Sequence, residues 1–527
     1  MRLSRLHAGL LALLAATAPL ASVAAQDAGL GSIDFPTSAS PAAAPHFERG
    51  VLALHNFWMR EARSAFRAAQ QAEPAFALAY WGEALTYAHP LWITPDRPAA
   101  LATLARLAPD SSGRLARARD ARERAYLRAV ERLFAADDPE SGKRAYVLAM
   151  ADLVAAYPED DEAAALYAHA LHTMLPMPRH AQPEWREVVA LLERVFRRNP
   201  MHPGAAHYLI HVYDDPELAS RGLQAALAYS AIAPASPHAL HMPSHIFVQL
   251  GRWDDVIAAN EAAFAASDAW VRGQGLPLER RDYHALSWLA YGYLQAGRWS
   301  RVEALLAELE AVQRETSSSL IQSHLDEMRA RYVVETRRCS ELPLPPRNPP
   351  SAPLGDGNAL FAAGFCAAMR ADSATVREAR LRLDSLSTLE QGSMWGSVTG
   401  IMSRELGATL LYRQGQREEA IRQLEALARE EARLGIPSGP PEVLAPVREL
   451  LGELLLETGR SDAAAAEFRR ALERTPQRTR ALLGLARAER GRGADASAEE
   501  RLARLRAVLH QADPDVLLQL TGWGPRQ

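Results

Sequence analysis

The sequence contains little cysteine, has a net charge close to zero and has few long apolar runs. Only two of its 527 residues are Cys, and its formal net charge is −4. A charge this close to zero gives no basic footprint for nucleic acid or for a membrane surface. Past the N-terminus no apolar stretch reaches 18 residues, so we expect no membrane span. The chain also lacks a Gly-rich phosphate loop, a Gly-x-Ser-x-Gly elbow and a Cys-x-x-Cys pair. It therefore carries no sequence signature of the enzyme classes that these motifs identify.

The N-terminus is typical of a secretory signal peptide. Arg2 and Arg5 precede an apolar run from Leu10 to Leu20, and the small residues Val23 and Ala25 follow. We expect residues 1–25 to be removed by cleavage after Ala25, which predicts a periplasmic or secreted protein. Residues 26–45 are rich in Ala, Ser and Pro and are expected to form a disordered lead-in.

The two cysteines, Cys339 and Cys366, leave two alternatives open. In an oxidising compartment they are candidates for a disulfide, which would close a loop across a proline-rich stretch. They could equally be two buried free thiols.

From His46 onward the pattern is helical. Apolar residues recur at i, i+3, i+4 and i+7, and Pro, Gly and Asp separate the helices. His207 and His211 recur 34 residues later as His241 and His245, and 34 is the period of the tetratricopeptide repeat. The clearest unit runs from 451 to 476, with these residues in the order of that repeat: Gly452, Leu455, Gly459, Ala464, Phe468, Ala471 and Pro476.

These patterns predict an all-α fold, a tetratricopeptide-like α-solenoid of helix–turn–helix repeats. A proline-rich linker over 337–356 is expected to divide it into an N-terminal array, 46–336, and a C-terminal array, 357–527. The segments AYWGEALTYAHPLW, AAHYLIHVYDDP, HALHMPSHIFVQLGRWDDVIAANEAA and DYHALSWLAYGYLQAGRW together resemble a group of secreted bacterial tetratricopeptide proteins. This resemblance implies one long solenoid and brings no reaction with it.

The histidines are the candidate site. By repeat register they fall in slots that line the concave groove of such a solenoid, where ligands bind in this family. Neutral imidazole is the commonest transition-metal ligand, so a divalent Zn, Cu or Fe ion is a candidate cofactor. The candidate metal ligands are His207, His211, His241, His245, His238 and His169. Further groove residues expected to meet a ligand are Glu83, Tyr87, His284 and Tyr291.

We expect the i, i+4 pairs His207/His211 and His241/His245 to form one four-histidine site across neighbouring helices. Pro243 complicates this register, because a proline inside a helix removes one backbone hydrogen bond. The loop between His172 and His180 adds two methionines and is a weaker candidate for copper.

Three functions fit these residues. The first is an extracytoplasmic solenoid that binds a peptide, a protein or a small ligand in its groove, with a histidine-bound metal. The second is a metal-dependent enzyme that uses the same imidazoles, with Glu83 as a base or an extra ligand and one open coordination position. The third is a metal-free assembly scaffold.

Overall fold

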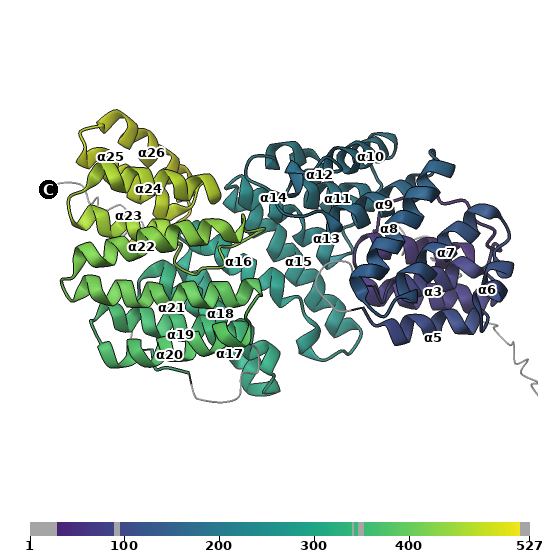
Figure 1. The fold of residues 1–527 in the computed structure, drawn as a ribbon, viewed down its shortest axis with the longest axis horizontal. Coiled ribbons are helices and arrows are strands. Elements are labelled where there is room, and N and C mark those ends of the chain that lie inside the picture. The colour runs from purple at the N-terminus through teal and green to yellow at the C-terminus, as the bar shows by residue number, and fades with distance from the viewer. Residues whose placement is uncertain (1–28, 89–94, 340–341, 346–352, 517–527) are drawn as a thin grey trace, which may run out of the picture.

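The fold consists of helices packed in sequence, each against the next (Figure 1). The computed structural model describes residues 29–88, 95–339, 342–345 and 353–516, and within these ranges it contains no strand. The prediction of an all-α, tetratricopeptide-like α-solenoid is confirmed. The predicted signal peptide and its cleavage site lie outside the described residues. None of the described helices combines the length and the apolar character that a membrane crossing needs.

The small residues of the repeat act as expected. A Cβ added at Gly452 would lie 2.8 Å from the Phe468 ring, and one added at Gly484 would lie 2.2 Å from the same ring. Phe468 is fully buried, so it fills the space that the two glycines leave between three helices. The turn at Gly459 has φ +75°, a conformation that glycine adopts without strain. The repeat pattern therefore has a direct packing cause.

The first hydrophobic core runs from Leu30 to Tyr167. This core includes residues of the segment before α2. That segment was expected to be a disordered lead-in, whereas the structure packs its described residues against the core. Leu30 is buried, and the Phe35 ring lies 5.1 Å from the Tyr126 ring. Glu123 accepts hydrogen bonds from the backbone N–H and the hydroxyl of Ser38. These buried apolar side chains and hydrogen bonds hold the segment against the core, although its composition is typical of a disordered segment.

The helices of the first core are α2 (Ala44–His55), α3 (Met59–Ala72), α4 (Ala77–Leu85), α5 (Arg97–Leu107), α6 (Ser111–Arg117), α7 (Ala121–Ala135), α8 (Pro139–Ala156) and α9 (Asp161–Met174).

The second core runs from Ala165 to Met328 and also takes in residues 482–516 near the C-terminus. Its helices, which carry the candidate site, are α10 (Trp185–Arg198), α11 (Pro203–Tyr213), α12 (Ala219–Ile232), α13 (Pro237–His241), α14 (Pro243–Gln249), α15 (Trp253–Gly273), α16 (Tyr283–Gln295), α17 (Trp299–Thr316) and α18 (Ser319–Thr336).

The third core runs from Ala330 to Ala488. Its helices are α19 (Pro353–Met369), α20 (Ser373–Leu389), α21 (Met394–Arg413), α22 (Arg417–Glu431), α23 (Val447–Glu457), α24 (Ser461–Arg474), α25 (Thr479–Gly491) and α26 (Asp495–Val508).

The C-terminal helices return to the middle of the chain, so the cores do not follow the expected division into two arrays. The buried guanidinium of Arg478 donates to Glu449, to Glu335 and to the hydroxyl of Tyr291. The backbone N–H of Thr479 donates to the side chain of Gln295. These contacts fasten the start of α25 to α16 and α18.

A disulfide joins Cys339 and Cys366, whose Cα atoms lie 5.3 Å apart. It connects the segment after α18 to α19, on either side of the predicted linker. Part of that linker lies outside the described residues.

We predict that Cys339→Ser lowers the free energy of unfolding by about 3–4 kcal/mol, because the closed loop of about 28 residues no longer restricts the unfolded chain. Denaturant unfolding of the oxidised protein measures this change. A titration of the denatured, unreduced wild type should find no free thiol. Two free thiols per chain would contradict the prediction.

Candidate metal centre

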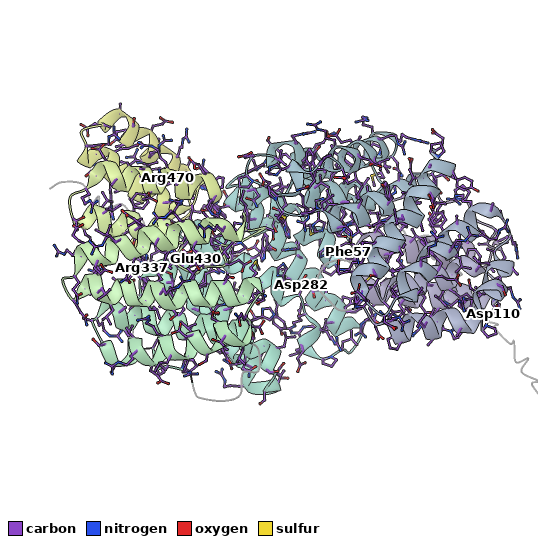
Figure 2. All side chains as sticks on the ribbon, viewed as in Figure 1. Phe57, Asp110, Asp282, Arg337, Glu430 and Arg470 are labelled. Atoms are coloured by element: carbon purple, nitrogen blue, oxygen red, sulfur yellow. A yellow bond between two sulfur atoms is a disulfide. The ribbon has the colours of Figure 1, made fainter. Side chains whose placement is uncertain are left out.

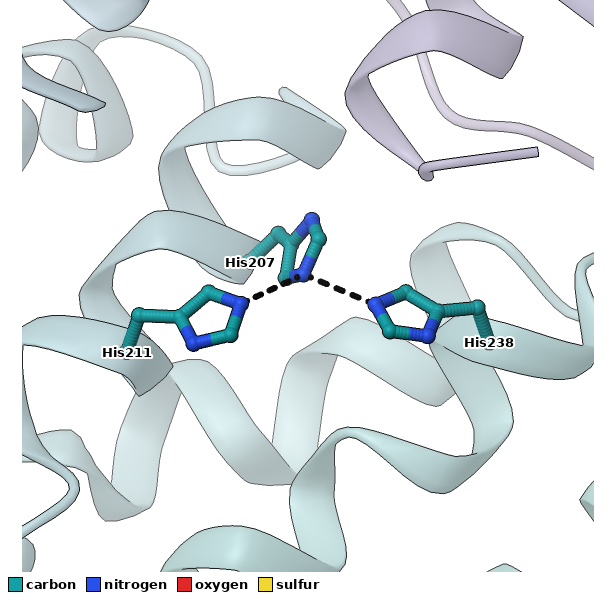
Figure 3. A group of neighbouring side chains, drawn as sticks. All are labelled: His207, His211 and His238. Carbon is teal, nitrogen blue, oxygen red and sulfur yellow. Dashed lines mark hydrogen bonds between the residues drawn. The ribbon is translucent and has the colours of Figure 1, made fainter. Parts of the chain in front are cut away.

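Three histidines from two helices meet at one point. His207 and His211 lie one turn apart on α11, and His238 comes from α13 (Figure 3). The Nε2 atoms of His211 and His238 each lie 3.1 Å from the Nε2 atom of His207. We call this group triad A.

The protonation of His207 is set by the turn after α2. Its Nδ1 atom lies 2.7 Å from the backbone carbonyl oxygen of His55, which can only accept. Nδ1 therefore carries the hydrogen, and Nε2 presents its single lone pair to both neighbouring rings. One lone pair cannot align well with two N–H donors at once. A tetrahedral metal ion with bonds of about 2.0–2.1 Å would place its nitrogen ligands about 3.3–3.4 Å apart, close to the 3.1 Å that separates Nε2 of His207 from each of the other two nitrogens.

A second group, triad B, consists of His241 on α13, His245 on α14 and His284 on α16. One ring nitrogen from each lies within 4.8 Å of the others. Nδ1 of His241 lies 2.6 Å from Oδ1 of Asn260, and the Asn260 amide donates to the carbonyl of Val256, which fixes Oδ1 as the acceptor.

The result at triad B is a set of lone pairs without donors. Since Nδ1 of His241 donates to Asn260, its Nε2 atom holds a lone pair, and that atom is buried with no hydrogen-bond partner. Nδ1 of His245 donates in the same way to Oδ2 of Asp214, at 2.8 Å. Nε2 is thus the free atom of both rings. Hydrogen bonds of this kind orient histidine ligands in metal sites.

Burial favours the neutral form of three of these imidazoles. It is the largest cause that lowers the pKa values of His207, His211 and His241 well below 6.5, and neighbouring histidines lower them further. Neutral imidazole is the form that binds metals. The ring nitrogens of each triad also lie within 4.8 Å of one another, so both triads have the geometry to hold a metal ion.

Two aromatic side chains, Phe57 and Trp288, frame the triads. Phe57 follows α2 with φ +51°, a conformation that is strained for a non-glycine residue, and its ring centroid lies 4.4 Å from that of His207. In Figure 2 Phe57 lies toward the middle of the molecule. The Trp288 ring lies 4.5 Å from that of His245 and 5.0 Å from that of His241.

A loop before α23 covers Trp288. A Cβ added at Gly439 would lie 2.2 Å from the Trp288 ring, so only glycine fits there, and the carbonyl of Pro437 accepts from Gln249. Triad B is thereby backed by a segment that follows it by more than 150 residues in the sequence.

A third group, His55, Glu162 and His202, is fully buried but is better explained as a network of hydrogen bonds and ion pairs, in which His202 and Glu162 form an ion pair. The backbone N–H of Ala205 donates to Nδ1 of His202, so Nε2 of His202 carries the hydrogen and faces Glu162 at 3.1 Å. Nε2 of His55 lies 2.6 Å from the other carboxylate oxygen. Both nitrogens are thus occupied by protons. This network fixes the turn whose carbonyl orients His207.

The structure groups the histidines differently from the expected four-histidine site. His207 and His211 join His238, whereas His241 and His245 join His284. The equivalent slots of neighbouring repeats thus fall into different groups, although the rings of His211 and His245 lie 6.1 Å apart. Convergence occurs between opposite flanks of adjacent helices, and α13 contributes His238 to one side and His241 to the other. Pro243 begins α14, and both histidines stay helical.

His169 lies beside triad A. Its ring stacks on Tyr208 at 4.3 Å and lies 6.5 Å from that of His211, and both of its ring nitrogens are buried without partners. It does not belong to the group of converging nitrogens.

The structure does not bring Glu83, Tyr87 or Tyr291 to the histidines. The buried carboxylate of Glu83 is bonded to Arg67, Arg106 and Gln70, with Tyr87 beside them. Tyr291 accepts from Arg478 in the contact with α25.

The methionine-containing loop is not gathered around a copper-like site either. His172 is buried on α9, Met177 is largely exposed, and His180 faces Asp215 at 3.8 Å.

The sequence reasoning missed the residues behind the ligands. His55 and Asn56 follow an apolar run and looked like an ordinary helix end, although both are fully buried. Asp214 directly follows α11, and its place in the sequence gave no sign of its contact with His245. Only the buried placement of these polar groups reveals their role.

Comparisons with known proteins add little. No family model matches the chain, and no curated protein matches it. Similar solved structures include the human IFIT1 dimer with m7Gppp-AAAA, at 14% identity, 90% of this chain, 91% of that chain and a TM-score of 0.37. The tetratricopeptide domain of P58(IPK) matches at 14% identity, 86% of this chain, 98% of that chain and a TM-score of 0.20. These scores are too low to support any conclusion about ligands. The expected absence of a nucleic-acid partner thus stays a prediction, although the IFIT1 structure holds m7Gppp-AAAA.

We predict that Glu162→Gln lowers the free energy of unfolding by about 3–5 kcal/mol at pH 7, because an amide N–H then faces a histidine N–H in a buried site. Burial alone would raise the pKa of Glu162, but His202 and His55 outweigh it, and the pKa lies below 4.5. The stabilisation by the carboxylate is therefore complete above pH 4.5 and disappears as the pH falls through the lowered pKa. Denaturant unfolding at pH 7 and at lower pH measures this change.

The matched control is Glu159→Gln, which removes a carboxylate that is largely exposed and pairs with Arg198. It should change the stability by no more than about 0.5 kcal/mol. If Glu162→Gln behaves like this control at pH 7, the network does not support the fold as described.

Proposed function

We propose that the protein is an extracytoplasmic α-solenoid that binds transition-metal ions at two three-histidine sites and, through them, a ligand. The observation that carries this proposal is triad B. There a buried imidazole nitrogen of His241 has no hydrogen-bond partner, and Nδ1 of His245 bonds to Asp214, which leaves its Nε2 atom to bind a ligand. Lone pairs that face one another without a donor repel, and a bound cation removes this cost. Zn, Cu and Fe all accept imidazole ligands.

The proposed location rests on two observations. The N-terminal sequence is typical of a secretory signal peptide. The disulfide between Cys339 and Cys366 is a bond that persists in oxidising compartments.

A metal-dependent enzyme is the second candidate. Each triad supplies three protein ligands, the number found in catalytic zinc sites, where the fourth position is open to water or substrate. Glu83 is not part of this candidate site as a base or an extra ligand, because its carboxylate is bonded to two arginines.

Metal content tests the proposal directly. We predict that the purified protein, dialysed against limiting zinc, retains the metal, and that the double variant His241→Ala/His245→Ala loses metal from triad B. His510→Ala, which removes an exposed histidine near the C-terminus, is the control and should keep the wild-type content. Equal metal content in the wild type and in a variant that lacks all six triad histidines would show that the sites do not exist. A metal-free scaffold would then be the better reading.

We also predict that Asp214→Asn weakens metal binding by about 10–100-fold, because the carboxylate that orients His245 is lost. Asp215→Asn is a matched control, since Asp215 is adjacent and bonds to the backbone N–H of Glu217 instead. Competition with a chromophoric chelator gives both affinities. Equal affinities for the two variants would contradict the assignment of Asp214.

A further inference from the structure

The two triads lie side by side. The ring of His211 in triad A lies 6.1 Å from that of His245 in triad B, and the ring of His238 lies 6.3 Å from that of His241. Helix α13 carries one ligand of each triad, since His238 and His241 are spaced i, i+3 on the same short helix. The same turn of backbone therefore belongs to both sites.

Metal ions bound at the two triads would carry positive charge that the ligands themselves do not neutralise. All six triad ligands are imidazoles, and no carboxylate belongs to either triad. Carboxylates lie outside the two triads: Asp214 is bonded to His245, Glu162 to His55, and the charges of Asp282 and Glu327 act on His284. Two divalent ions would bring four positive charges among rings that are buried or half-buried, apart from the exposed ring of His284. Such charge needs a counter-ion close by, because burial of unpaired charge costs several kcal/mol per ion.

We propose that triads A and B hold two metal ions as one dinuclear centre, and that the open positions of the two ions take a small oxyanion across them. This inference rests on the proposed function. Two-metal sites bind phosphoryl and carboxyl oxygens in this way, with one oxygen on each ion. The neutral ligand set leaves the anion to supply the missing negative charge. Substrates or ligands of this protein would then carry a phosphate or a carboxylate group.

The alternative is two independent mononuclear sites that share only a helix. In that case each ion would complete its coordination with water, and removal of one triad would leave the chemistry of the other unchanged. Electron paramagnetic resonance distinguishes the two arrangements, because two Cu(II) ions joined by a bridging ligand couple magnetically and two distant ions do not.

The first experiment uses the full chain loaded with two equivalents of Cu(II) in the presence of inorganic phosphate. A dinuclear centre should show a resonance intensity well below that of two isolated ions. The variants His211→Ala/His238→Ala and His245→Ala/His284→Ala should each bind one ion with its full intensity. If a double variant does not fold, as judged by circular dichroism, His211→Asn and His245→Asn replace it, and the wild-type spectrum is decisive in any case.

The second experiment measures inorganic phosphate by calorimetry on the zinc-loaded protein. Phosphate should bind to the wild type and bind about tenfold or more weakly to either triad variant, because one of the two clamping ions is missing. Two bound ions with full, uncoupled Cu(II) intensity, or equal phosphate affinity in the variants, would overturn the dinuclear centre and leave the proposed function intact. Failure of the wild type to bind any metal would overturn both.

Discussion

The hydrogen bonds at the Nδ1 atoms are the constraint on which the candidate site depends. His207 donates to the carbonyl of His55, His241 to Asn260 and His245 to Asp214. Each bond fixes one tautomer and turns the other nitrogen of the ring toward its neighbours. Without these bonds the same histidines could pair with one another as donors and acceptors. With them, His207, His241 and His245 each turn a lone pair toward the neighbouring rings, and a cation is the natural partner of such a site.

Those bonds in turn depend on distant parts of the chain. The carbonyl that orients His207 belongs to the turn after α2, and the network of His55, Glu162 and Tyr208 holds that turn against α9 and α11. On the other side, the loop at Gly439 backs Trp288, and the contacts of Arg478 fasten the C-terminal helices to α16 and α18. The return of the last helices to the second core therefore gives triad B a fixed wall.

The sequence predicted the fold well because its signals are local. Gly452 and Phe468 occupy repeat positions whose packing depends only on the neighbouring helices, and they pack as expected. The site was predicted in part. Five of the six triad histidines were chosen as metal ligands, and His284 was placed in the groove. Their grouping was not predicted, because repeat register says which slots are equivalent and does not say which flanks face each other.

The residues around the ligands could not be predicted for a related reason. His55 and Asp214 meet the site through contacts that span 152 and 31 residues. The lead-in was expected to be disordered from its composition, yet the side chains of Leu30 and Phe35 and the hydrogen bonds of Ser38 attach it to the first core. In both cases the structure depends on a few buried contacts, and the composition of a segment does not reveal such contacts.

Anomalous diffraction from crystals of the zinc-loaded protein tests the central claim most directly. The account predicts two peaks, one among His207, His211 and His238 and one among His241, His245 and His284, each with metal–nitrogen distances of about 2.0–2.1 Å. Absence of a peak at both triads, or a peak only between His55, Glu162 and His202, would contradict it.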